Sequence, residues 1–193
     1  MRATVLLLAF IAANANLNLK PILISSYVGF LKLSPSFAGY IVGIEAGISA
    51  IVMALAAMLL MKVGAQRMYL LAAGLIVGGN LLSLAAHSFI SLALARFIAG
   101  IGHGAASAVC AAAIATFASP ARISAAVAIV VSIAAMGLMF VITWMQSLAG
   151  IDLLFLAMAL VVVPPLLLLY WFRLMSPEAN DLQRSSSDSL PFG

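Results

Sequence analysis

The chain has 193 residues, of which 66% are hydrophobic and only 7% are charged, with a formal net charge of +4. A soluble domain carries about 25% charged residues, and a core of this length could not bury so much apolar surface, so the solvent must be lipid. The cations outside the apolar stretches lie singly, which excludes a nucleic-acid surface, and the single cysteine, Cys110, excludes an internal disulfide.

Six long apolar segments follow one another, each near or above the roughly 20 residues that a membrane-spanning helix needs. Their apolar runs are continuous rather than alternating, which argues against the strands of a membrane barrel. We therefore predict an all-α membrane protein, a bundle of six transmembrane helices joined by short loops. The predicted spans are about 3–31, 36–61, 68–86, 89–118, 123–145 and 151–172, and the breaks fall at 32–35, 62–67, 87–88, 119–122 and 146–150.

Lysine and arginine outside the spans gather on one side of the predicted bundle. With the N-terminus inside, six of them are cytoplasmic and only Lys32 is outside, which is a positive-inside signal. Both termini are then cytoplasmic, and we expect the polar, serine-rich tail at 173–193 to be disordered. The six cytoplasmic cations are Arg2, Lys62, Arg67, Arg122, Arg173 and Arg184.

The start of the chain has a second interpretation. Arg2, an apolar run and the small residues Ala13-Asn14-Ala15 resemble a signal peptide with its cleavage site. The apolar character continues to Phe30, with Lys20 as its only charge, and this favours a retained membrane span. Intact-mass measurement of the purified protein distinguishes the two.

The first span is polar for a membrane helix, because it carries three asparagines and Lys20, followed by Pro21. Asn16 and Lys20 are four residues apart and therefore share a helix face, while Pro21 tends to kink the helix. We interpret Asn16 and Lys20 as the lining of a polar cavity. Packing between helices through polar side chains is the alternative.

Glu45 and a glycine stripe occupy opposite faces of the second span. Gly39, Gly43 and Gly47 repeat every four residues, which is typical of a face that another helix approaches closely. Glu45 lies two positions from Gly43 and Gly47, about 200° around the helix, and so points away from that face. Glu45 is therefore either a member of a static ion pair or a site that couples a proton or the substrate.

Arg96, His103 and Cys110 recur every seven residues along one stripe of the fourth span. Arg96 stays protonated and needs an acceptor, whereas a histidine can titrate near neutral pH. His103 can thus be a functional site or a hydrogen-bonded structural group, and Cys110 is interpreted as a small packing residue. The glycines of this span thin the helix, leaving room for a neighbouring backbone or a ligand. These glycines are Gly100, Gly102 and Gly104.

Lys20, Glu45 and Arg96 are full charges inside spans, and each costs at least ~2.5–3.5 kcal/mol near the bilayer centre. At about 1.5 Å per residue, they lie roughly 10 to 16 Å below the outer ends of their spans. We therefore predict that Glu45 pairs with Lys20 or with Arg96 in a polar interior. The sequence has no metal-ligand spacing, phosphate-binding loop or nucleophile–base pair, so we expect no metal, no cofactor and no enzymatic activity.

Two stretches carry a resemblance to a known family. In the fourth span, Leu92 and Arg96 are followed by the glycine-rich run that begins at Gly100. After the second span, Ala57, Leu59, Met61, Lys62 and Gly64 align with the pattern Gly-x-Leu-x-Asp-Arg-x-Gly-Arg-Lys, with Arg67 three residues further on. Together with six spans and short loops, these stretches resemble the N-terminal six-helix half of a Major Facilitator Superfamily (MFS) transporter.

The resemblance implies a secondary transporter, or half of one, that moves a small polar or charged solute by alternating access. It also implies coupling to protons, as in symport, and a place in a bacterial cytoplasmic (inner) membrane. Members of the family have two six-helix halves, so we expect a second half, either a homodimer partner or a separate chain. The other expected partners are the lipid bilayer, the solute and H⁺. Because Met61 stands where the family has an acid, a non-transporting structural or regulatory subunit is the alternative. The residues expected to bind substrate or ion are Asn16, Lys20, Glu45, Arg96 and His103, and the loop-motif residues are Lys62, Gly64 and Arg67.

Overall fold

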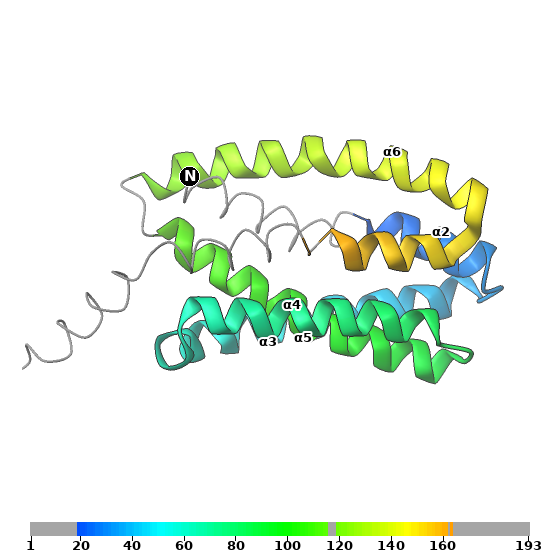
Figure 1. Ribbon diagram of the computed structural model, residues 1–193, viewed down its shortest axis with the longest axis horizontal. Coiled ribbons are helices and arrows are strands. Elements are labelled where there is room, and N and C mark those ends of the chain that lie inside the picture. Colours follow the sequence, from blue (N-terminus) through cyan, green and yellow to red (C-terminus); the bar gives the residue numbers. More distant parts are fainter. Residues whose placement is uncertain (1–18, 116–118, 162, 164–193) are drawn as a thin grey trace, which may run out of the picture.

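The computed structural model describes residues 19–115, 119–161 and 163, and this part of the chain is helical without strands (Figure 1). The all-α fold expected from the sequence is therefore present. The predictions for Asn16, for most of the first span, for the end of the sixth and for the tail concern residues outside these ranges. The helices are α2 (Lys20–Gly29), α3 (Pro35–Val63), α4 (Ala65–Leu84), α5 (Phe89–Ala115) and α6 (Pro120–Leu160).

Four of these helices contain stretches long and apolar enough to cross a bilayer, and a shorter apolar helix, Gly150–Leu160, follows them. Their outward-facing side chains include many large hydrophobic groups, which water would not tolerate but lipid does. The chain is therefore an integral, multi-pass membrane protein. The four stretches are Pro35–Ala56, Ala65–Leu84, Phe89–Ala115 and Pro120–Trp144.

Serine and proline define where two of the helices begin. The Ser34 side chain accepts a hydrogen bond from the Phe37 amide (3.3 Å), and Pro35 occupies the first turn of α3, where no amide donor is needed. Before α5, Ser88 Oγ accepts from the Ser91 amide (3.1 Å) and Ser91 Oγ accepts from the Ser88 amide (3.0 Å). This reciprocal pair satisfies amide groups that the start of a helix leaves without partners.

Single glycines make two of the turns that the sequence predicted as longer loops. α3 ends at Val63 and α4 begins at Ala65, so only Gly64 (φ 82°) separates them. The helical conformation of α6 continues through the predicted break at 146–150 and is interrupted at Gly150 (φ 74°). A positive φ is costly for any residue with a Cβ, which explains how one glycine can reverse the chain in each case.

The described helices form two groups in space. Helices α3, α4 and α5 lie together, and the first part of α6 runs along the opposite side (Figure 1). Between them lie α2 and the segment of α6 that follows Gly150 (Figure 1). Gly79 allows α4 to approach α5 closely, because a Cβ there would lie 2.7 Å from the Ala99 amide nitrogen and 2.8 Å from the Ala95 carbonyl oxygen.

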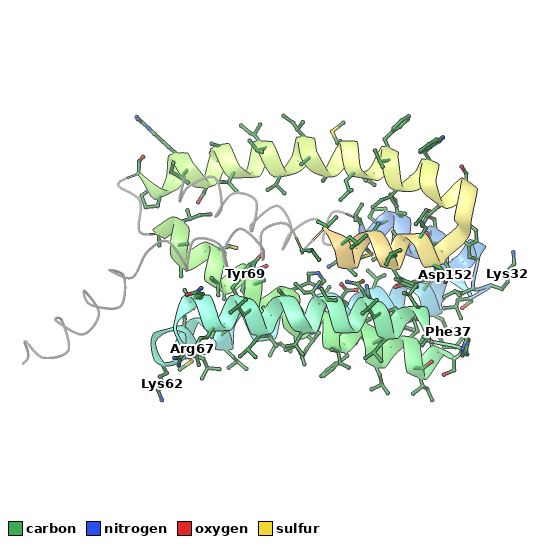
Figure 2. The ribbon with its side chains drawn as sticks, viewed as in Figure 1. Lys32, Phe37, Lys62, Arg67, Tyr69 and Asp152 are labelled. Atoms are coloured by element: carbon green, nitrogen blue, oxygen red, sulfur yellow. The ribbon has the colours of Figure 1, made fainter. Side chains whose placement is uncertain are left out.

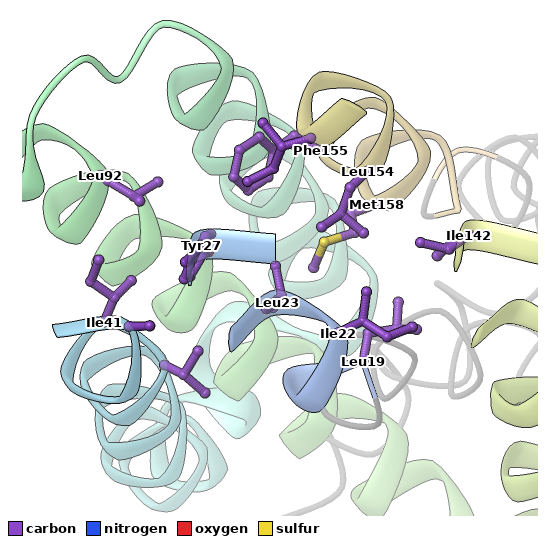
Figure 3. Close-up of a cluster of buried hydrophobic side chains, with 13 residues drawn as sticks. Leu19, Ile22, Leu23, Tyr27, Ile41, Leu92, Ile142, Leu154, Phe155 and Met158 are labelled. Atoms are coloured by element: carbon purple, nitrogen blue, oxygen red, sulfur yellow. The ribbon is translucent and has the colours of Figure 1, made fainter. Parts of the chain in front are cut away.

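Two buried apolar clusters occupy different levels along the bundle. The Leu23 cluster joins α2, α3, α5 and α6 (Figure 3), and the Tyr69 cluster joins α3, α4 and α5. Along α5, Leu92 belongs to the former and Ala106 to the latter, so the intervening turns lie between two apolar layers. The Leu23 cluster contains Leu19, Ile22, Leu23, Tyr27, Ala38, Ile41, Val42, Leu92, Ile142, Ile151, Leu154, Phe155 and Met158. The Tyr69 cluster contains Ala56, Met68, Tyr69, Ala72, Ala73, Ile76, Ala106, Ala108, Val109 and Cys110.

Candidate functional site

The candidate site is a buried polar group between the two apolar clusters, centred on the Glu45 carboxyl. Glu45 comes from the middle of α3 and is 3% exposed. Its Oε2 lies 3.6 Å from Arg96 Nη1, and its Oε1 lies 3.5 Å from His103 Nδ1, both on α5. Of the two pairings that the sequence left open, the structure has Glu45 with Arg96. One carboxyl group therefore faces two basic side chains, which stand two turns apart on the same helix.

Arg96 is fully buried and has a second polar partner, which the sequence analysis did not identify. Its Nη2 donates a hydrogen bond to Asn80 Oδ1 of α4 at 2.7 Å. The guanidinium also lies over the Phe155 ring, with Cζ 5.4 Å from the ring centroid, a distance suited to a cation–π contact. Arg96 thus contacts α3, α4 and α6 from its place on α5.

The bond to Asn80 is short, whereas the contact with Glu45 is longer than a hydrogen bond. N–H···O hydrogen bonds span about 2.7–3.2 Å, so the 3.6 Å between Arg96 and Glu45 is an ion pair without a direct hydrogen bond. Such a pair is held by charge alone and is sensitive to any change in that charge. Removing one partner of a buried pair typically costs about 3–5 kcal/mol, because the other charge stays buried.

Lys20 approaches the same group from the first turn of α2. Its side chain is half-buried, and its charge acts on the Glu45 carboxyl. Within the described residues Lys20 forms no ion pair as short as 4 Å, so it adds to the local positive charge without neutralising Glu45. Asn16, its predicted neighbour on the same face, lies outside the described residues.

Glycines on α5 set the helix spacing that lets Glu45 reach both basic groups. A Cβ on Gly100 would lie 2.8 Å from the Glu45 carbonyl oxygen, and one on Gly104 would lie 2.9 Å from Val52 Cβ, both on α3. On the other side of α5, a Cβ on Gly102 would lie 2.6 Å from the Ala72 carbonyl oxygen of α4. The three glycines therefore admit α3 and α4 to backbone contact with α5.

The glycine stripe of α3 has a different environment. Gly43 and Gly47 are exposed, and a Cβ on Gly39, Gly43 or Gly47 would meet nothing within 4 Å among the described residues. Glu45 points to the opposite, buried side, as its position two residues from Gly43 and Gly47 predicts. The close helix contact that we expected at this stripe is absent from the described part of the chain, and packing against a partner outside it stays a prediction.

The comparison with known families decides the class of this membrane protein. The family model of the Major Facilitator Superfamily matches residues 5–191. The chain belongs to the Major Facilitator Superfamily. No curated protein matches it at a significant level. MFS proteins are transporters, so the family match supports a transport role for this membrane chain.

The MFS loop motif lies at the end of the bundle opposite to Lys32 and Asp152. Lys62 and Arg67 are exposed at that end, on either side of the turn at Gly64 (Figure 2). Gly64, which aligns with a glycine of the family pattern, has a positive φ, and Lys62 and Arg67 lie on either side of it. In this MFS chain, the acid of the motif is replaced by Met61.

Two buried polar contacts in this MFS chain escaped the sequence analysis. Asn80 lies in an apolar span directly after two glycines. An amide side chain in such a place needs a hydrogen-bond partner on a neighbouring helix, and this signal could have identified Asn80 as a partner of a buried charge. Gln146, expected in a loop, is helical, and its Nε2 donates to Ser26 Oγ of α2 at 2.7 Å. Ser26 in turn donates to the Ile22 carbonyl oxygen (2.6 Å), so this contact ties α6 to α2.

Proposed function

We propose that this MFS chain, or the pair of halves to which it contributes, moves a small polar or charged solute by alternating access, coupled to a proton. The observation that carries the proposal is the buried Glu45 carboxyl, which lies 3.6 Å from Arg96 and 3.5 Å from His103 without a direct hydrogen bond to Arg96. A lone carboxyl between two basic groups, on two closely packed helices, suits a group that exchanges a proton.

In the proposed cycle, the charge of Glu45 decides how strongly α3 is attracted to α5. An ionised Glu45 attracts Arg96 and holds the pair together. A proton on the carboxyl removes that attraction, because the pair is held by charge rather than by a hydrogen bond. Arg96 then has donors free for an anionic group of the solute, and the half-buried Lys20 adds positive charge on the same side. Asn16 and His103 complete the proposed set of binding residues.

The proposed orientation in the membrane follows from the placement of charges. Lys62 and Arg67 lie at one end of the bundle, and Lys32 lies at the other (Figure 2). The positive-inside rule places the former end in the cytoplasm, with both termini on that side of a bacterial cytoplasmic membrane.

A second six-helix half, from another copy or a separate chain, is part of the proposal. Solute sites in this type of transporter lie at the interface of two repeats. The open glycine stripe on α3 supports a close helix contact with that half, because all three positions have room for a neighbouring backbone.

The test is proton-coupled flux in reconstituted vesicles. The purified protein is placed in proteoliposomes with an inward proton gradient, and uptake of a panel of labelled carboxylates, amino acids and sugars is measured. Glu45→Gln should abolish uptake or uncouple it from the gradient. Asp152→Asn removes an exposed carboxyl at the end of the bundle and should leave uptake unchanged. Gradient-driven uptake by Glu45→Gln equal to that of the unaltered protein would refute the role of Glu45.

A non-transporting structural or regulatory subunit is the second candidate. Met61 in place of the motif acid favours it, since the loop then lacks the charge that the family pattern carries there. Under this hypothesis, the vesicles show no flux of any solute in the panel, while the protein still associates with another membrane chain in native mass spectrometry.

A further inference from the structure

Asn80 is held in one orientation by two hydrogen bonds. Its Nδ2 donates to the Ile76 carbonyl oxygen one turn earlier on α4 (2.9 Å), and its Oδ1 accepts from Arg96 Nη2 (2.7 Å). A carbonyl oxygen can only accept and a guanidinium can only donate, so the amide satisfies both partners in this orientation alone. Asn80 and Arg96 are both 0% exposed, so water does not compete for either bond.

The helices that carry this bond are in direct contact beside it. Gly79, the neighbour of Asn80, lies against the backbone of α5 at Ala95, which precedes Arg96, and at Ala99, one turn after Ala95. Asn80 and Arg96 therefore belong to one closely packed pair of helices. Glu45, by contrast, reaches Arg96 from α3 over the longer distance of 3.6 Å.

We propose that Asn80 is a positioning residue, which anchors Arg96 to α4 while Glu45 is its exchangeable partner. This role rests on the proposed function, in which the Glu45 charge is switched by a proton. A neutral amide suits the task, because it binds Nη2 without cancelling the positive charge that Glu45 or an anionic solute must meet. Without the anchor, the Arg96 guanidinium would change position each time the ion pair with Glu45 is released.

The charged and titratable groups around Arg96 define what else could hold it. Tyr27 faces it from α2, Glu45 from α3 and His103 from its own helix, and the charge of Lys20 on α2 acts on Glu45 and His103. Glu45 is the single carboxyl among these groups. When Glu45 is replaced by glutamine, a carboxylate introduced at position 80 is therefore the one negative charge that can pair with Arg96.

The first experiment measures the mobility of the Arg96 guanidinium directly, in the protein labelled with ¹⁵N-arginine in lipid nanodiscs. Its resonances are assigned by their loss in Arg96→Lys. Hydrogen exchange at Nη2 should speed up about tenfold in Asn80→Ala, because a hydrogen bond to a charged group is lost, and should stay slow in Glu45→Gln. If Glu45→Gln releases the guanidinium and Asn80→Ala does not, the anchor is Glu45 and the proposal is overturned.

The second experiment covers the case in which Asn80→Ala does not fold. Glu45→Gln should lower the Tm in nanodiscs, and Glu45→Gln combined with Asn80→Asp should recover most of the loss, because the new carboxylate meets Arg96. The matched control combines Glu45→Gln with Ser83→Asp, since Ser83 is buried on the same helix but is bonded to the Gly79 carbonyl oxygen. Equal recovery by both double variants, or recovery by neither, would contradict the proposal. Neither experiment measures flux, so their outcome is separate from that of the transport assay.

Discussion

Replacing Gly100 by alanine is the most direct test of how the site is assembled. An alanine Cβ there would collide with Ile48 Cγ2 and would lie 2.8 Å from the Glu45 carbonyl oxygen. The Ile48 side chain can rotate away, but the carbonyl oxygen belongs to the backbone of α3 and moves only with the helix. Ordinary carbon–oxygen contact begins near 3.4 Å, so α3 and α5 must separate by about 0.6 Å at this level.

That separation is large enough to weaken both contacts of the Glu45 carboxyl. The contacts of Glu45 with Arg96 and His103 are 3.6 and 3.5 Å, so the same displacement takes both to about 4 Å or beyond. Overpacking of a buried contact costs about 1–3 kcal/mol, and we expect Gly100→Ala to destabilise the protein by an amount in this range.

Gly74→Ala is the matched control, because it makes the same chemical change on an open face of α4, away from the α3 stripe. Nothing lies within 4 Å of its Cβ among the described residues, and replacing a glycine within a helix by alanine gains roughly 0.5–1 kcal/mol. The assay is thermal unfolding of both variants in the same nanodiscs, followed by tryptophan fluorescence. A Gly100→Ala protein as stable as the unaltered one, or equal losses in the two variants, would refute the reasoning from helix spacing.

Three other variants test separate contacts. Gly150→Ala should lower stability by about 1–2 kcal/mol in thermal unfolding, because alanine is strained at φ 74°, and an unchanged Tm would contradict the single-glycine turn. Gln146→Leu should cost about 1 kcal/mol by the same measurement, since it removes the bond to Ser26 but leaves that hydroxyl bonded to Ile22; no loss would mean that the bond contributes nothing. Gly43→Ile should leave the fold intact, judged by circular dichroism, but weaken association with a second half in native mass spectrometry; unchanged association would exclude the α3 stripe from that interface.

The sequence predicted the helices and the buried charges well, because both depend on features that are local. Long apolar runs suffice to identify membrane helices, and the MFS family match agrees with them. Counting residues from the span ends placed Glu45 and Arg96 at similar depths, and helical periodicity placed Glu45 away from Gly43. The structure agrees on both points.

What the sequence did not predict depends on how helices rotate and pack. Asn80 became a partner of Arg96 only because α4 packs against α5 with its amide turned inward, and Phe155 covers Arg96 only because the chain reverses at Gly150. The turns at Gly64 and Gly150 were predicted too long, since the pattern of polar residues does not reveal that one glycine with positive φ is enough, whereas the break predicted at 87–88 is longer in the structure, at 85–88. A close helix contact at the α3 glycines stays a prediction, since nothing lies within 4 Å of their Cβ positions among the described residues.

Cys110 gives this protein a useful experimental property. It is the chain's single cysteine, and at 2% exposure within the Tyr69 cluster its thiol is covered by α3 and α4. Reaction with a membrane-permeable maleimide therefore requires those helices to part from α5. The native protein carries its own reporter for opening at that level, and cysteines added at exposed positions can be labelled for distance measurements against an almost silent background.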